Sequence, residues 1–177
     1  LEEALRSFST GPAGAYSDLR VVDENLSTIA SSAWAMQGTP AWIASSIPDL
    51  APGNCVTGCA FMLNAIAREN IMARIRDKAV MHDHFSALCI AVDGGTLVPV
   101  PEALVLYRQH SDNQIGAVRM RGPFERLLRL PKDLRNLSYI HAQAGQVGID
   151  VSFLRFVFWA ARTVYRRSRE QARPIAN

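Results

Sequence analysis

Cysteine is scarce in this sequence, which has three in 177 residues. An odd number of cysteines with no signal peptide ahead of them argues against a disulfide-stapled secreted domain, so we expect a cytoplasmic protein in a reducing compartment. Long apolar runs are missing as well. A membrane-spanning helix needs roughly 18 apolar residues, and the best candidate, residues 151–167, is interrupted by Arg155 and Arg162.

Glycine-rich nucleotide-binding loops are also missing, since neither a Walker loop nor a GxGxxG motif occurs. The segment PGNCVTGCA, residues 52–60, has Gly53 and Gly58, which let backbone approach a ligand closely, but by itself it is a weak signal. We find no internal repeat and no low-complexity segment. With 49% apolar and 20% charged residues, the composition is that of a globular domain with a sizeable core, which argues against fibres and disorder.

Charge is distributed unevenly along the chain. Residues 1–118 carry 7 basic and 12 acidic side chains, whereas residues 119–177 carry 12 basic and 4 acidic ones. The basic part is expected to meet something anionic. Nucleic acid is not the expected partner, because this part has no zinc-finger spacing, heptad or RNA-binding signature.

The hydrophobic pattern predicts alternating helices and strands. Breaker clusters and β-forming runs separate these elements, and Pro99 and Pro101 restrict the last strands to edges or bends. The order is a helix (1–8), a strand before a turn at 23–25, two helices capped by Ser27 and Thr39, a strand (56–62), helices at 64–73 and from His82 to Gly94, two short strands, and a helical tail broken at Pro123, Pro131 and 145–148. This order predicts an α/β fold with an appended tail.

Asp83 is the most informative single position, because it stands at the start of an apolar helix, where free amide groups and the helix dipole stabilise a carboxylate. It is either a helix N-cap or a general base that takes a proton from a substrate hydroxyl. His82 and His84 flank it, and either could tune its charge. Two residues apart on a helix, they face different sides, so a shared metal ion is not expected.

A second polar group follows the last β-like run. His110 enters a turn-rich loop, a common place for ligand or metal contacts, although a solvated loop histidine is the simpler interpretation. In a regular strand Arg108 shares a face with His110, and it either pairs with a diphosphate or carboxylate or forms a surface salt bridge. Asp18, at an earlier strand end, either faces a ligand or opens a turn.

The cysteines leave a zinc site arithmetically open. Cys55 and Cys59 together with nearby histidines would give a Cys/His ligand set, but a CxxxC spacing is not the usual zinc knuckle. Free cysteines more often act as small buried apolar residues.

Three blocks in this order resemble a known family: SDLRVVDENL (17–26), GNCVTGCAFMLN (53–64) and MHDHFSALCIAVDGGTLVPVPEALVLYRQHSDNQIGA (81–117). They resemble the second half of bacterial family 2 glycosyltransferases of the GT-A fold, particularly rhamnosyltransferase-like members. The resemblance covers about residues 1–117. It implies an inverting transferase that moves a sugar, rhamnose being one candidate, from a nucleotide-sugar to a saccharide or lipid-linked acceptor in cell-surface polysaccharide synthesis.

The resemblance also implies roles for individual residues. Asp83 matches the base that deprotonates the acceptor hydroxyl, and His110 matches a histidine that helps to coordinate the divalent cation, Mg²⁺ or Mn²⁺, on the nucleotide diphosphate. His82 stands where relatives often have an acidic residue, and His84 stands where an aromatic residue is common, so the acceptor stays open. The loop that lines the donor-sugar and acceptor pocket is matched by Asn54, Thr57 and Gly58.

The resemblance has one large departure. Relatives begin with a nucleotide-binding βα region and an Asp-X-Asp motif that holds the metal, and this sequence contains no Asp-X-Asp. We therefore expect residues 1–118 to be the acceptor-side part of a GT-A domain, with the main metal ligands in a missing N-terminal part, and the 177-residue chain alone to transfer no sugar. The alternative is a truncated, inactive module that docks on a membrane or a partner.

The basic tail, residues 119–177, lies outside the specific part of the resemblance. A helix within it is predicted to place Phe153, Phe156, Val157 and Ala160 on one stripe before an arginine-rich end. It either packs on the domain or rests through residues 151–169 on the inner face of the cell membrane.

Overall fold

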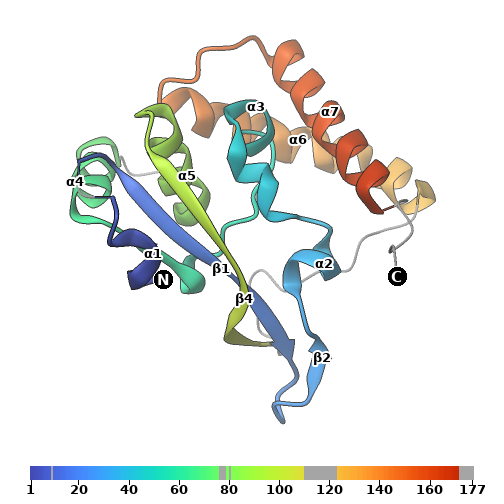
Figure 1. The fold of residues 1–177 in the computed structure, drawn as a ribbon. Coiled ribbons are helices and arrows are strands. Elements are labelled where there is room, and N and C mark those ends of the chain that lie inside the picture. The colour runs from blue at the N-terminus through green and yellow to red at the C-terminus, as the bar shows by residue number, and fades with distance from the viewer. Residues whose placement is uncertain (9, 76–78, 80, 110–122, 172–177) are drawn as a thin grey trace.

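The computed structural model describes residues 1–8, 10–75, 79, 81–109 and 123–171, the side chains of the last range from residue 132 onward. These residues form an open mixed sheet of four strands with helices packed against it (Figure 1). The predicted α/β class is confirmed. The elements are α1 (Glu2–Leu5), β1 (Ala13–Val22), β2 (Thr28–Ala30), α2 (Ala33–Gln37), η1 (Ala41–Ser45), α3 (Ile47–Leu50), η2 (Gly58–Ala60), β3 (Phe61–Leu63), α4 (Ala65–Arg74), α5 (His82–Val92), β4 (Thr96–Arg108), α6 (Pro123–Gln146) and α7 (Phe153–Gln171).

Strand β1 is the centre of the sheet. Along one edge it pairs in parallel with β4, over the whole length of β1. Its other edge is shared by two short antiparallel partners, β3 at residues 14–16 and β2 at residues 21–22. Every residue of β1 except Arg20 is buried, as expected for a strand covered on both faces.

Strand β4 departs from the prediction of two short strands. It is one strand of 13 residues, and the register with β1 shifts so that Pro101 and Glu102 fall between the pairs formed by Val100 and Ala103. Proline has no backbone N–H to donate to a neighbouring strand. Among the described strands β4 pairs with β1 alone, and Pro99 and Pro101 are tolerated at such an edge position. The edge position of these residues was predicted correctly, but the predicted division into two short strands was wrong.

The segment around residue 30 also differs from the prediction. Thr28–Ala30 is a strand, and Ser32, not Ser27, caps the following helix by accepting a hydrogen bond from the Ala35 amide at 3.0 Å. Asp18 is buried beside this cap. Its carboxylate accepts from the amides of Ala33 and Trp34, both at 3.1 Å, so Asp18 closes the start of α2 and neither opens a turn nor faces a ligand.

Two further boundaries differ. Thr39 caps no helix, because η1 begins after Pro40, and the predicted strand at 56–62 is a 3-10 turn, η2, followed by the short β3. By contrast, helix α4 starts where the sequence indicated. Its N-cap, Asn64, accepts from the Ala67 amide at 2.9 Å.

Helix α5 forms the middle of the core, as its three-and-four spacing predicted. Phe85, Leu88 and Cys89 are fully buried and pack with Tyr16 and Leu50 in the largest apolar cluster. The helix ends at Val92, before Gly94, which has a φ of 69° that glycine adopts without strain.

The tail folds back onto the domain. Helix α6 continues through Pro131, where a break was predicted, and α7 lies beside α3 (Figure 1). Phe156 on α7 is fully buried. No helix in the described ranges is long and apolar enough to cross a bilayer.

Candidate functional site

The predicted base lies where the loop before η2 meets the start of α5. One oxygen of the Asp83 carboxylate accepts a hydrogen bond from the Gly58 amide at 3.1 Å. The other accepts from the His84 amide at 2.7 Å, with the Asn54 side-chain amide at 3.5 Å, a long contact. The N-cap of α5 is Met81, so Asp83 is not the cap, although it stands in the positively polarised first turn.

Asn54 and Thr57 belong to the loop that approaches Asp83. The Asn54 side-chain oxygen accepts from the Val56 amide at 2.9 Å, a local turn that leaves its amide nitrogen directed at Asp83. Thr57 is half-buried beside Gly58, and its carbonyl accepts from the Ala60 amide at 2.9 Å. The structure thus brings together the second and third sequence blocks.

Gly58 lies in close contact with the ring of His82. A Cβ built there would lie 2.5 Å from Nε2 of His82, nearer than side chains normally come. His82 is exposed and lies over this glycine, next to Asp83. His82 therefore lies at the surface beside Gly58 and Asp83, and its contact with substrate stays a prediction.

His84 points the other way, into the core. It is fully buried, and its Nε2 donates to the Leu50 carbonyl at 2.9 Å while Nδ1 accepts from the Gln143 side-chain amide at 3.1 Å. Burial lowers the pKa of His84, which favours this neutral form. Both ring nitrogens are engaged by protein groups, so the prediction that His84 contacts substrate does not fit its position. It fixes the start of α5 against α3 and α6.

Cys59 and Tyr107 were given no part in the Asp83 site by the sequence, and the structure couples the first to Asp83 and the second to Cys59. Partial burial and the Asp83 charge both raise the pKa of the Cys59 thiol, and burial together with Cys59 raises the pKa of Tyr107. Strand β4 packs against η2, which contains Cys59. The signal for both residues was available, since Cys59 adjoins Gly58 and Tyr107 alternates with exposed positions along β4.

Arg108 follows Tyr107 and is exposed. Because strand residues alternate, its side chain leaves the opposite face of β4 from Tyr107, and its contact with substrate stays a prediction. His110, the predicted metal contact, lies outside the described residues.

A metal site is not found among the residues that the structure describes. No three His, Cys, Asp or Glu side chains come together within the described ranges. Cys55 is buried, its thiol donating to the Ala41 carbonyl at 3.6 Å, and burial raises its pKa to about 11. Cys59 is exposed, so the two cysteines are not arranged as zinc ligands.

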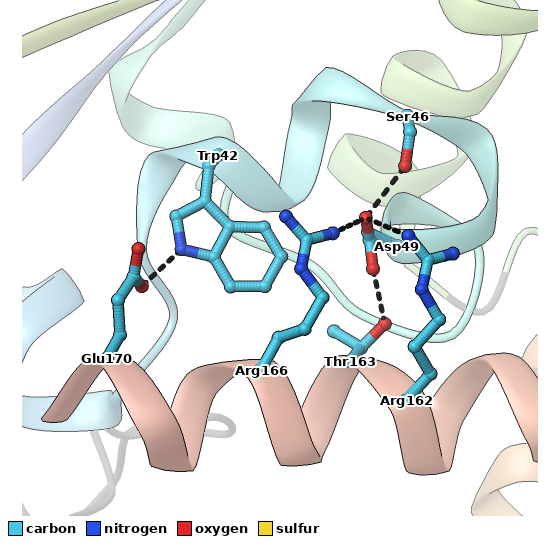
Figure 2. A network of polar contacts seen from close by, with 7 residues as sticks. All are labelled: Trp42, Ser46, Asp49, Arg162, Thr163, Arg166 and Glu170. Atoms are coloured by element: carbon cyan, nitrogen blue, oxygen red, sulfur yellow. Dashed lines mark hydrogen bonds and ion pairs between the residues drawn. The ribbon is translucent and has the colours of Figure 1, made fainter. Parts of the chain in front are cut away.

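A second polar cluster joins α7 to α3 (Figure 2). Asp49 is 1% exposed and accepts hydrogen bonds from the hydroxyls of Ser46 at 2.8 Å and Thr163 at 2.9 Å. It also pairs with Arg166, and with Arg162 at 3.8 Å. Burial acts to raise the pKa of Asp49, but these hydroxyls and arginines outweigh it and lower the pKa.

Comparison of the chain with protein-family models, with curated proteins and with solved structures finds no match. Any functional assignment therefore depends on the geometry of the residues themselves.

Proposed function

We propose that this chain is the acceptor-side part of an inverting glycosyltransferase of the GT-A fold, acting in the cytoplasm on a saccharide or lipid-linked acceptor. One observation carries the proposal. Asp83 is half-buried at the first turn of α5, and its carboxylate accepts a hydrogen bond from the Gly58 amide. This bond connects the loop before η2 with the start of α5, the two segments to which the resemblance assigns the pocket and the base. The mixed α/β sheet is compatible with this fold.

The chemistry needs one carboxylate with room for a substrate. The acceptor hydroxyl oxygen forms a bond to the anomeric carbon while the bond from that carbon to the nucleoside diphosphate breaks, and the hydroxyl proton passes to Asp83. The negative charge of the breaking bond leaves with the diphosphate. A single displacement inverts the anomeric carbon.

The neighbours of Asp83 have positioning roles in this scheme. The Gly58 amide holds one carboxylate oxygen, and the His84 ring anchors the first turn of α5 through Leu50 and Gln143. A divalent cation would stabilise the departing diphosphate. Following the resemblance, we assign the nucleotide ligands and the main metal ligands to residues outside the described part of this chain.

The test is a transfer assay on the natural reading frame that encodes this chain, expressed in full. Purified protein is incubated with Mg²⁺ or Mn²⁺, a panel of nucleotide-sugars including a rhamnose donor, and saccharide acceptors. We expect release of nucleoside diphosphate and a product whose anomeric configuration, read by NMR, is inverted. The isolated 177-residue chain is expected to give no turnover.

The matched variants are Asp83→Asn and Glu69→Gln, the latter an exposed carboxylate on α4. Removing a general base costs about 100-fold to 10,000-fold in rate, so Asp83→Asn should reduce turnover by at least about 100-fold and Glu69→Gln should not change it. Retention of the anomeric configuration, or full turnover by Asp83→Asn, would refute the proposal.

A further inference from the structure

Helix α7 docks on the domain through most of the stripe that the sequence predicted, with Val157 and Ala160 half-buried, and through neighbouring positions that it did not predict. Phe156 and Thr163 are buried, and Arg166 pairs with Asp49 (Figure 2). Of the stripe predicted from the sequence, Phe156 is buried, whereas Phe153 is 37% exposed. Pairing with a buried aspartate therefore turns part of the arginine-rich surface of α7 inward.

The outward face of α7 is apolar. Leu154 is 82% exposed, Phe158 is 67% exposed and Tyr165 is 63% exposed. Together with Ala161 these positions are separated by four, three and four residues, which places them in one line along the helix. Val164, 47% exposed, widens the line on one side. We call these five residues the outer stripe.

A row of arginines borders the outer stripe. Arg155, Arg162 and Arg169 are exposed and follow one another at intervals of seven residues, close to two helical turns, so they lie on one side of the stripe. Two of them lie near aromatic rings of the same helix, Arg155 at 5.8 Å from the Trp159 centroid and Arg169 at 5.9 Å from that of Tyr165.

Negative charge is nearly missing from this helix. Glu170 is the one acidic residue of α7, and it is hydrogen-bonded to Trp42 of η1 (Figure 2). Arg162 of this border also pairs with Asp49 at 3.8 Å, so Arg155 and Arg169 are the border residues that bring positive charge to the exposed surface of α7, beside its large apolar side chains.

We propose that the outer stripe of α7 lies on an anionic phospholipid surface. Leu154, Phe158 and Tyr165 would enter the boundary between headgroups and acyl chains, while Arg155 and Arg169 pair with headgroup phosphates. Charge complementarity favours this occupant over an uncharged protein groove. The inference does not depend on the transferase proposal, since it uses no residue of the Asp83 site.

The test is co-sedimentation of the 177-residue chain with vesicles of phosphatidylcholine alone or mixed with phosphatidylglycerol. We expect binding to the anionic vesicles only. Raising the salt from 0.1 to 1 M shortens the screening length from about 10 to about 3 Å and should weaken that binding.

Variants separate the apolar contribution to vesicle binding from the electrostatic one. The double variant Leu154→Glu/Phe158→Glu should abolish sedimentation, while Met72→Glu, equally exposed at 65% but on α4, should not affect it. Arg155→Ala and Arg169→Ala should each weaken binding about fivefold, the contribution of one basic residue near an anionic surface. Both Leu154 and Phe158 are exposed, so the thermal unfolding of the double variant is expected to match wild type and to show that the fold is kept.

Three outcomes would overturn the inference. The first is equal binding to uncharged and anionic vesicles, and the second is unchanged binding by the double variant. The third is that the chain binds no vesicles and forms a stable dimer in sedimentation velocity, which the double variant converts to monomer. The last outcome would assign the stripe to a second copy of the chain.

Discussion

Two aspartates of this protein, Asp49 and Asp83, have opposite surroundings. Asp49 is almost completely buried, and its two oxygens are saturated by two hydroxyls and two guanidinium groups. Asp83 is half-buried, and its contacts beyond its own helix are one amide at 3.1 Å and a long contact to Asn54 at 3.5 Å.

The difference indicates what each carboxylate can do. A carboxylate offers about four acceptor sites. At Asp49 these are used to fasten α7 to α3, and a substrate hydroxyl would find none of them available. At Asp83 two hydrogen bonds and one long contact leave acceptor capacity, which is what a base that must touch a substrate requires.

Removing the Asp49 carboxylate should destabilise the fold most. Asp49→Ala loses two hydroxyl hydrogen bonds to a charged group and leaves two arginines without their partner, although these stay about 40% exposed and can be solvated. We expect the free energy of unfolding to fall by about 2 to 3 kcal/mol, measured by urea denaturation.

Asp133→Ala, an exposed aspartate on α6, is the control and should be neutral. Hydrogen exchange should show α7 losing protection before α5 in Asp49→Ala. If the amides of α7 stay protected from exchange in Asp49→Ala, the Asp49 cluster does not stabilise the docking of α7.

The Asp83 region should respond to mild acid through His84. Burial lowers the pKa of His84, so the folded protein holds it neutral while the unfolded chain takes up a proton below its ordinary pKa of about 6.5. The stability that neutral His84 contributes is complete above this value, and it is lost as the pH falls toward the lower folded pKa. Urea denaturation between pH 8 and 5 measures this slope.

His82→Gln, at the exposed neighbour, should keep the slope, and His84→Gln should reduce it. A slope that is unchanged in His84→Gln would mean that other groups control stability in this range.

Substituting Gly58 should affect the site more than the fold. The Cβ of Gly58→Ala would press on the exposed His82 ring, which can turn away, so we expect the unfolding free energy to change by less than about 1 kcal/mol. Transfer activity should fall, because His82 is displaced beside Asp83. At Gly95 the added Cβ meets the backbone oxygen of Pro12, so Gly95→Ala should destabilise far more. Equal effects at both glycines would contradict this explanation.

The elements that were predicted best from the sequence are those whose burial follows a simple period. Helix α5 was found because Phe85, Leu88 and Cys89 repeat on one face. The inward contact of Arg166 on α7 was not predicted, because arginines count as polar in a periodic pattern. The partner that draws Arg166 inward, Asp49, lies 117 residues away in the chain.

The site was predicted in outline by the order of the blocks. Asp83, Asn54 and Gly58 meet as expected, and His82 borders them. The roles of His82 and His84 could not be separated from the sequence, because the phase of a helix relative to its core is set by packing. In the structure the His84 ring forms hydrogen bonds with Gln143 and Leu50.

Asp83 thus acts as a chemical group and Asp49 as a structural one under the proposed function. The most direct test measures both the rate of sugar transfer and the free energy of unfolding for Asp83→Asn and Asp49→Asn in the fully expressed reading frame. We predict that Asp83→Asn lowers the rate at least about 100-fold while stability changes by no more than about 0.5 kcal/mol, and that Asp49→Asn lowers stability while each folded molecule keeps its rate. A wild-type rate in Asp83→Asn would contradict this division of roles.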